Sequence, residues 1–257
     1  MFWSLELSGH KTRLDRYISQ QTTLSKSQVR MLVAQRKIWV DDQIAQSVQQ
    51  TVDEFCEVRV EGQILAKKTP DYWMLYKPVG VLSATQDAKH PVAVDCLRAL
   101  SVVQRQDLHL VGRLDLHSSG LLLLTNDGRW SQAMIAPHNK MPKVYQVVVQ
   151  NPLTEQMVQG FNEGVFLTYE QVTTRPAKLK ILAPNLAEVT LWEGRFHQIK
   201  RMFKRLGNRV MALHRVQIGP VKLDASLLPG QSRRLTPPEV QALSQVNTAT
   251  NKENFSD

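Results

Sequence analysis

The opening part of the chain alternates apolar and polar positions at two different spacings. Apolar residues recur every three or four positions in two stretches, which predicts two amphipathic helices: Leu14, Tyr17 and Ile18, then Val29, Leu32 and Val33. Ser25 and Gln28 have the spacing of a capping box, so the second helix is expected to begin there. Residues 38–40 and 55–60 alternate as strands do, with Cys56, Val58 and Val60 expected on the core face. This pattern predicts a small domain over residues 1–62, with its core in 11–60.

The rest of the chain follows a different plan. Residues 63–70 lack periodicity and are expected to form a linker. A larger domain is expected over residues 71–244, with strands near 72–76, 109–111, 121–125 and 144–149. Because these strands and the intervening helices show no regular βαβ repeat, the fold class is expected to be α+β with a mixed or antiparallel sheet. Residues 245–257 are polar, and we expect a frayed tail there.

Charge narrows the function more than composition does. The 257 residues are 42% hydrophobic and 21% charged, which is ordinary for a globular protein, but the net charge is +9. Such an excess of Lys and Arg is typical of proteins with a polyanionic partner such as nucleic acid. No apolar run is long enough to span a membrane and no secretory leader is visible, so neither a membrane nor export is expected. Cys56 and Cys96 lie far apart, which favours a cytoplasmic location over a disulfide framework.

One polar loop between two apolar stretches is the first candidate for chemistry. It reads Gly112-Arg113-Leu114-Asp115-Leu116-His117-Ser118-Ser119-Gly120. A single Asp in such a loop is most often a turn cap. No second carboxylate is placed for paired acid and base catalysis, and no cluster of metal ligands or phosphate-binding motif is present. Any chemistry is therefore expected to use one carboxylate, without a metal or cofactor.

A strongly basic segment is the second candidate. Residues 193–205 contain an apolar stripe at helical spacing, Ile199, Met202 and Phe203, and the other side of the helix is almost entirely cationic or imidazole: His197, Lys200, Arg201, Lys204 and Arg205. A solvated amphipathic helix would explain the stripe. A phosphate-binding surface explains both the stripe and the charges, so we favour contact with RNA.

The N-terminal segment resembles an S4-type RNA-binding domain. The resemblance lies in Arg13-Leu14-Asp15-Arg16-Tyr17-Ile18, Ser25-Lys26-Ser27-Gln28-Val29-Arg30 and Lys37-Ile38-Trp39-Val40. It implies that the two helices present basic residues to folded RNA, namely Arg13, Arg16, Lys26 and Arg30. On charge alone, these residues could equally form an ordinary solvated helix face.

The larger domain resembles the RsuA-type pseudouridine synthases. The matching motifs are Gly112-Arg113-Leu114-Asp115, Gly120-Leu121-Leu122-Leu123-Leu124-Thr125-Asn126-Asp127-Gly128, Lys143-Val144-Tyr145, Glu193-Gly194-Arg195-Phe196-His197-Gln198-Ile199-Lys200-Arg201-Met202 and Leu213-His214-Arg215-Val216-Gln217-Ile218-Gly219. Several separated motifs in the same order are far more specific than any one of them. The resemblance implies a synthase fold and isomerisation of uridine to pseudouridine without a cofactor.

The resemblance also assigns roles to residues. It implies that Asp115 is the nucleophile and that Tyr145 stacks on the flipped base. Lys200 is the best match for the basic partner of Asp115, with Arg195 and Arg201 as open alternatives. Arg113 would hold a phosphate or fill the space that the base vacates. The remaining residues expected to contact RNA are Arg195, His197, Arg201, Lys204 and Arg215.

The details around His197-Gln198 and His214 favour small-subunit rRNA. The implied substrate is a single uridine of 16S rRNA, of the type at position 516, in free RNA or in a small-subunit assembly intermediate. The enzyme is expected to be a monomer. Two alternatives remain open at this point: the same chemistry on 23S rRNA, and a non-catalytic rRNA-binding assembly factor.

Overall fold

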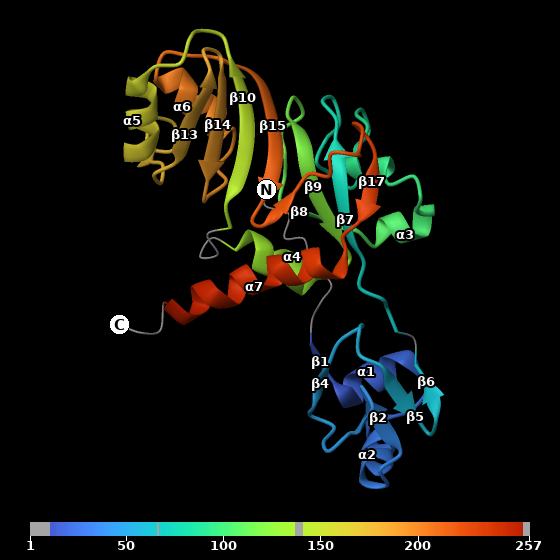
Figure 1. Ribbon diagram of the computed structural model, residues 1–257. Helices are drawn as coiled ribbons and strands as arrows, with labels where there is room; N and C mark the ends of the chain where they lie inside the picture. The colour runs from blue at the N-terminus through green and yellow to red at the C-terminus, as the bar shows by residue number, and fades with distance from the viewer. Residues whose placement is uncertain (1–10, 66, 137–140, 254–257) are drawn as a thin grey trace. The chain divides into compact units, whose positions relative to one another are not determined.

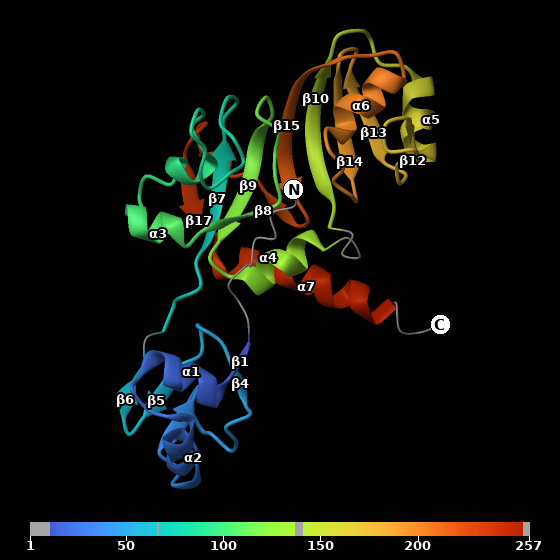
Figure 2. The same ribbon diagram turned by 180° about the vertical axis from the view of Figure 1, so that it is seen from behind.

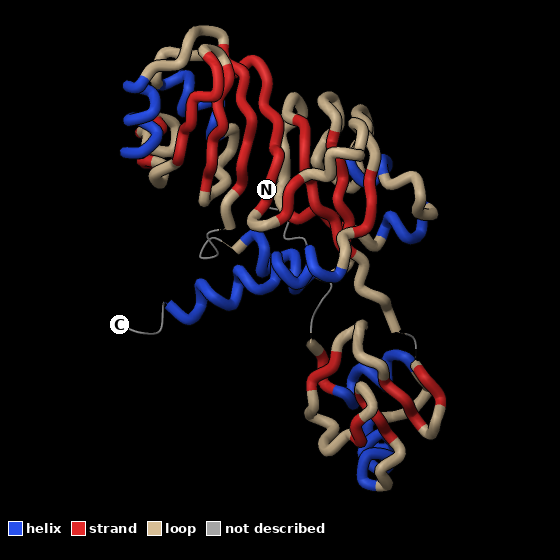
Figure 3. The backbone as a smooth tube through the Cα atoms, in the orientation of Figure 1, coloured by secondary structure: helices blue, strands red, loops and turns tan. Residues whose placement is uncertain are grey.

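The computed structural model describes residues 11–65, 67–136 and 141–253, with side chains described up to residue 245. Its chain divides into two compact units. One runs up to Asp71 and includes Asp127–Arg129, and the other comprises Tyr72–Asn126 and the chain from Trp130 onward. The second unit is rich in strands (Figure 3).

The N-terminal unit is built on two helices and short strands. Its elements are β1 (Thr12–Arg13), α1 (Leu14–Gln21), α2 (Lys26–Ala34), β2 (Ile38–Val40), β3 (Gln43–Ile44), β4 (Thr51–Val52), β5 (Val58–Val60) and β6 (Gln63–Ile64). The expected capping box starts α2, because the Ser25 side chain accepts from the Gln28 N–H and the Gln28 side chain accepts from the Ser25 N–H. The apolar helix positions close on the strands in one core that includes Leu14, Ile18 and Val29.

The segment expected to be a linker is partly folded. Gln63–Ile64 form β6, which pairs with β5. The Leu65 N–H then donates to the Val58 carbonyl at 2.8 Å, and the Lys68 N–H donates to the Glu54 carbonyl at 2.7 Å. Backbone pairing leaves no signature in side-chain periodicity over two residues, so the prediction of a linker from residue 63 was wrong at its start. The strand expected over 55–60 is also shorter, since β5 covers only Val58–Val60.

The larger unit contains one mixed sheet. Its elements are β7 (Tyr72–Lys77), the 3-10 helix η1 (Ala93–Cys96), α3 (Val102–Gln106), β8 (His109–Val111), β9 (Ser119–Thr125), α4 (Gly128–Ile135), β10 (Lys143–Val149), α5 (Glu155–Glu163), β11 (Phe166–Leu167), β12 (Val172–Thr173), β13 (Lys178–Ala183), β14 (Leu186–Leu191), α6 (Gln198–Arg205), β15 (Val210–Ile218), β16 (Val221–Lys222), β17 (Ser232–Arg234) and α7 (Pro237–Glu253). The main strand order is β13-β14-β10-β15-β9-β7-β17, with β16 on β15 and β8 on β9. Among these described pairings only β15 with β9 is parallel, so the mixed sheet is confirmed.

Different helices cover the two faces of this sheet. On one face, α5 and α6 pack over β13, β14, β10 and β15 (Figure 1), around Phe161 and Phe203. The same face of β7 and β9 packs on η1 and its neighbours, and Tyr145 contacts both of these cores. On the opposite face, α4 and α7 lie side by side (Figure 2), where the Trp130 Nε1–H donates to the Ser244 Oγ at 3.0 Å. Tyr145 therefore lies where two cores meet on one face.

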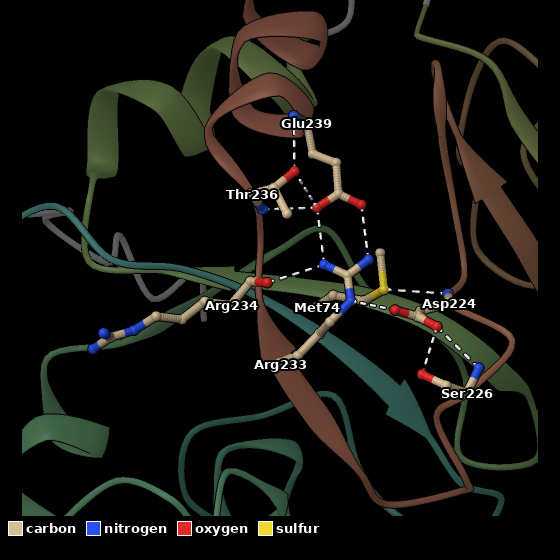
Figure 4. Close-up of polar contacts among 7 residues, drawn as sticks. All are labelled: Met74, Asp224, Ser226, Arg233, Arg234, Thr236 and Glu239. Atoms are coloured by element: carbon tan, nitrogen blue, oxygen red, sulfur yellow. Dashed lines mark hydrogen bonds and ion pairs between the residues drawn. The ribbon is translucent and has the colours of Figure 1, made fainter.

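The C-terminal helix begins at a network of ion pairs (Figure 4). Arg233 on β17 donates to both carboxylate oxygens of Glu239, at 2.8 Å each, and to the Asp224 carboxylate at 2.5 Å. The hydrogen bonds from Arg233 lower the pKa of Glu239 to about 2. From this anchor α7 runs to Glu253, so the expectation of a frayed tail from residue 245 was wrong for residues 245–253. Residues 254–257 of that tail lie outside the described residues.

Candidate active site

Four residues in register across the sheet form the floor of the site. Tyr145 on β10 pairs with Arg215 on β15, Arg215 with Gly120 on β9, and Gly120 with Lys77 on β7. Directly opposed residues share a face, so this cross-strand row lies on the face where the two cores meet. Gly120 has φ +108°, and a Cβ there would lie 2.2 Å from the Arg215 carbonyl oxygen. The close parallel approach of β9 and β15 therefore requires glycine at this position.

The loop that carries Asp115 is anchored on both sides of that residue. Before it, the Ser83 hydroxyl donates to the Leu114 carbonyl at 2.7 Å and accepts from the Leu114 N–H at 3.0 Å. After it, the Gly80 N–H donates to the Leu116 carbonyl at 2.8 Å. The Lys77 ammonium donates to the Ser118 carbonyl at 2.7 Å. With its neighbours held in this way, Asp115 projects from a fixed backbone.

Lys77 is a buried cation beneath this loop. Its side chain is fully buried, and besides Ser118 it donates to the Pro78 carbonyl at 2.9 Å. Burial lowers the pKa of Lys77 from 10.5 to about 8, while the nearby Asp115 charge acts in the opposite direction. The ammonium thus remains mostly charged at neutral pH and adds positive potential below the carboxylate.

Helix α6 brings two groups to the Asp115 carboxylate. The Lys200 Nζ lies 3.2 Å from one oxygen, Oδ2, and the His197 Nε2 lies 3.4 Å from the other, Oδ1. The Asp115 side chain keeps a quarter of its surface exposed. A carboxylate held at both oxygens but open to solvent can meet an incoming substrate in one defined orientation.

The two alternatives to Lys200 are engaged elsewhere. Arg195 pairs with Glu193, at 3.1 Å between its Nε and the carboxylate. Arg201 forms a two-pronged ion pair with Glu170 and donates to the Phe196 carbonyl at 3.2 Å. Spacing along the helix could not separate these three side chains. In the structure, only Lys200 of the three contacts Asp115.

The other residues expected to contact RNA differ in how much solvent they see. Arg113 is exposed on the loop, and Lys204 is exposed on α6. Arg215 is only 4% exposed, and its Nε–H donates to the Leu121 carbonyl at 2.7 Å. Its guanidinium lies 6.0 Å from the centre of the Tyr145 ring. Arg215 therefore belongs to the cross-strand row and not to the exposed surface, and its contact with RNA stays a prediction.

His214 lies on the opposite face of the sheet from Arg215, as strand alternation requires. Its Nδ1 is 2.9 Å from the Ser119 Oγ, and its ring centre is 5.2 Å from that of Tyr76. Burial lowers the pKa of His214 below its ordinary value. This residue, which the sequence connected with the choice of target, therefore does not share a face with Tyr145.

In the N-terminal unit all four predicted RNA contacts, Arg13, Arg16, Lys26 and Arg30, are exposed. The Arg13 guanidinium also makes two bonds to the buried Asp15, at 2.8 and 3.2 Å. Burial raises the pKa of Asp15, but the hydrogen bonds and charge of Arg13, the Arg16 N–H and the charge of Lys26 together leave the pKa below its ordinary value.

The described part of the chain contains neither a cluster of metal ligands nor a membrane-spanning helix. No group of three or more His, Cys, Asp or Glu side chains there is placed to hold a metal ion. No helix in that part is both long enough and apolar enough to cross a bilayer.

Comparison with known proteins decides the family. Residues 71–205 match the profile of RNA pseudouridylate synthases. The chain belongs to this family. The synthase is 39% identical over 229 residues to the ribosomal small subunit pseudouridine synthase A of Pseudomonas aeruginosa, covering 89% of this chain and 98% of the relative. It is 36% identical to the protein of the same name from Escherichia coli, and the match covers 90% of this chain and 99% of that relative. The crystal structure of a pseudouridylate synthase superposes with a TM-score of 0.66 at 36% sequence identity, and the match covers 90% of this chain and 99% of the other.

The sequence motifs led to this pseudouridine synthase family correctly, and they missed part of its site. Lys77 and Ser83, which fix the loop from below, were not among the predicted site residues. A signal for Lys77 was present: a lysine ends the otherwise apolar strand at residues 72–76, directly before Pro78. Nothing local indicated Ser83, because its partner Leu114 is 31 residues away.

Proposed function

We propose that this pseudouridine synthase isomerises one uridine of 16S rRNA and that Asp115 is its nucleophile. The observation that carries the proposal is the Asp115 carboxylate, which is held by Lys200 and His197 yet partly open to solvent. The proposal is also supported by the relatives described above, which are named as small-subunit enzymes and match about nine-tenths of this chain. We propose as target the uridine at position 516.

The reaction needs no group beyond these side chains. The N1–C1′ bond of uridine breaks, a C5–C1′ bond forms, the C5 hydrogen leaves as a proton and N1 gains one. A carboxylate can hold the sugar or the base covalently while the base turns. The Lys200 ammonium offsets the charge of Asp115 and fixes the direction in which it points. Before this step the uridine must leave its stack, at a cost of a few kcal/mol.

Tyr145 and Arg113 would receive the RNA around the flipped base. The Tyr145 ring lies between the two cores, with the Arg215 guanidinium beside it, which supports a role in stacking on the uracil. Arg113 is exposed on the same loop as Asp115 and would bind a neighbouring phosphate.

The N-terminal unit would add affinity rather than base choice. We propose that it is an S4-type domain, a unit separate from the catalytic domain, and that Arg13, Arg16, Lys26 and Arg30 bind the backbone of folded rRNA. In this proposal the enzyme works as a monomer in the cytoplasm, on free 16S rRNA or on a small-subunit assembly intermediate.

The test maps pseudouridine in 16S and 23S rRNA from cells that lack the protein. Complementation uses the wild type, Asp115→Ala, Lys200→Met and, as a matched control, Asp87→Asn in an exposed loop. We expect one 16S site to be lost and restored by the wild type and by the control, but not by Asp115→Ala. Lys200→Met should restore it only in part, because the carboxylate loses its partner. Unchanged 16S rRNA, a lost 23S site, or rescue by Asp115→Ala would contradict the proposal.

A further inference from the structure

An exposed aromatic side chain directly precedes a residue that contacts the Asp115 carboxylate. Phe196 has 65% of its surface exposed, although burying such a ring ordinarily stabilises a protein by about 1.5–3 kcal/mol. It directly precedes His197, whose Nε2 lies 3.4 Å from the Asp115 carboxylate. A single exposed apolar ring is common on protein surfaces, so what points to a ligand is the position of Phe196, next to the residue that contacts Asp115.

Phe196 and His197 form a stack that leads outward from the carboxylate. Their ring centres are 3.8 Å apart and their planes differ by 19°. His197 therefore covers one face of the Phe196 ring, and the exposed area lies on the other side. The geometry is that of a base step in RNA, in which a third planar ring can continue the stack.

The loop is fixed before any ligand arrives. His197 has φ 49° and ψ 31°, a left-handed conformation that is unusual for a residue with a side chain. Such a conformation persists only where the surroundings determine it. Here the Arg195 N–H donates to the Gln198 side chain at 3.0 Å, and that side chain donates in turn to Glu193 at 2.7 Å. The Phe196 carbonyl is also held, by Arg201 at 3.2 Å.

The same arginine connects a second exposed ring to this loop. Arg201 pairs with Glu170, and the residue before Glu170 is Tyr169, which is 92% exposed. Tyr169 lies in the turn between β11 and β12, so the ion pair holds that turn against the loop of Phe196. Two exposed rings thus lie on loops that Arg201 holds together, next to the cationic side of α6. Aromatic rings among cations are the composition of surfaces that bind single-stranded RNA.

We propose that Phe196, backed by His197, stacks on the base of an unpaired nucleotide next to the target uridine. This inference rests on the proposed function, because it takes the substrate to be RNA whose target uridine is bound at Asp115. Stacking the neighbouring base outside the site holds the strand open, so that the flipped uridine does not return to its stack. Tyr169 receives a nucleotide further along the same strand. The platform selects for an unpaired neighbour and accepts any base, because every base offers a planar face.

The test measures binding with Asp115→Asn, so that turnover does not affect the result. The probe is a hairpin of 16S rRNA that contains the proposed target uridine, together with versions that lack the base of each flanking nucleotide in turn. Replacing Phe196 by Ala should weaken binding roughly 5- to 150-fold, which corresponds to one stacked base. Phe196→Trp should stay within about 3-fold, whereas Phe196→Leu, apolar but not planar, should lose nearly as much as Ala. Phe166→Ala, at an exposed ring on β11, is the matched control.

A double-mutant cycle separates stacking from general loosening of the loop. If Phe196 stacks on one flanking base, then removing that base and replacing Phe196 by Ala should together cost no more than either change alone. In the otherwise wild-type enzyme, KM should rise in Phe196→Ala while kcat changes less than about 3-fold. Additive losses at every flanking position, equal binding by Leu and Trp variants, or unchanged binding by Phe196→Ala would overturn the proposal.

The two proposals fail in different ways. A hairpin that the wild type binds through Phe196 but does not isomerise would contradict the proposed target and support the stacking platform. A hairpin that the wild type isomerises, with binding indifferent to Phe196, would do the reverse.

Discussion

Replacing Lys77 by Met should slow catalysis far more than it destabilises the fold. Methionine fills nearly the same volume, so no cavity forms under the loop. The change removes the donor to Ser118 at 2.7 Å and the donor to Pro78 at 2.9 Å. Hydrogen bonds from a charged group contribute about 1.5–3 kcal/mol each.

The cost of burying the Lys77 charge offsets much of the stabilisation from these two hydrogen bonds. Burial lowers its pKa from 10.5 to about 8, and a shift of this size costs about 3 kcal/mol to keep the ammonium charged. We therefore expect Lys77→Met to lower the free energy of unfolding at neutral pH by at most about 3 kcal/mol. The Ser118 carbonyl is freed on one side of Asp115, however, and a displacement of about 1 Å at a reacting group can cost about 100-fold in rate. We expect kcat to fall roughly 10- to 100-fold, with KM nearly unchanged.

Two measurements check this prediction. Release of the C5 hydrogen from labelled uridine in an RNA substrate gives kcat and KM. Urea unfolding at pH 7.5 and pH 10 gives the stability. The folded protein releases the Lys77 proton near pH 8 and the unfolded chain near pH 10.5, so the wild type gains stability relative to Lys77→Met as pH rises through that window. Lys180→Met, at an exposed lysine on β13, is the control. A folded Lys77→Met variant with kcat within about 2-fold of wild type would refute the reasoning.

Three further changes have distinct expected outcomes. Gly120→Ala should destabilise the fold by at least about 3 kcal/mol, because the added Cβ would lie 2.2 Å from a backbone oxygen. Gly80→Ala, whose Cβ would have nothing within 4 Å, should cost only about 1–2 kcal/mol. Equal losses of stability in thermal melts of the two variants would contradict this. Glu239→Gln should lower the free energy of unfolding above pH about 4.5. The difference in stability from the wild type should shrink as pH falls from there to below about 2, where Glu239 is protonated in the folded and the unfolded chain. A difference in urea midpoints that does not change with pH would count against this prediction. His197→Gly relieves the strain of a left-handed backbone but removes the contact of His197 with the Asp115 carboxylate. The free energy of unfolding should therefore stay within about 1 kcal/mol of the wild type, while kcat falls. An unchanged kcat would show that this contact does not contribute to catalysis.

The local elements were predictable because their causes are local. The helix starts and stripes followed from spacing and capping: Ser25 caps α2, and Ile199, Met202 and Phe203 are buried on α6. Strand β10 followed from alternation over residues 143–149. Periodicity failed where backbone pairing alone makes the structure, as in β6, and where an ion pair anchors a polar helix, as in α7.

The family resemblance predicted more of the site than residue spacing did. It gave Lys200 as the best match for the partner of Asp115, but spacing left Arg195 and Arg201 open, and neither motif by itself shows that the Lys200 and Asp115 side chains meet at 3.2 Å. That contact depends on the packing of α6 and on the register that sets Arg215 opposite Gly120. The burial of Arg215 and Lys77 has the same origin, because a basic residue in a sequence does not reveal which side of a sheet covers it.

The parallel pairing of β9 with β15 has a consequence for the order of events during synthesis. Ser119 and His214, which are paired in these two strands, lie 95 residues apart in the chain. Contacts of such long range form late, after the entropy of closing a long loop has been overcome. Because chains fold as they emerge from the ribosome, the floor of this site does not exist until β15 has been translated. A nascent chain that stops short of residue 210 carries the complete Asp115 loop and the whole of α6, and still has no strand to join them. The synthase thus cannot become competent before the segment that forms β15, Val210–Ile218, has been made.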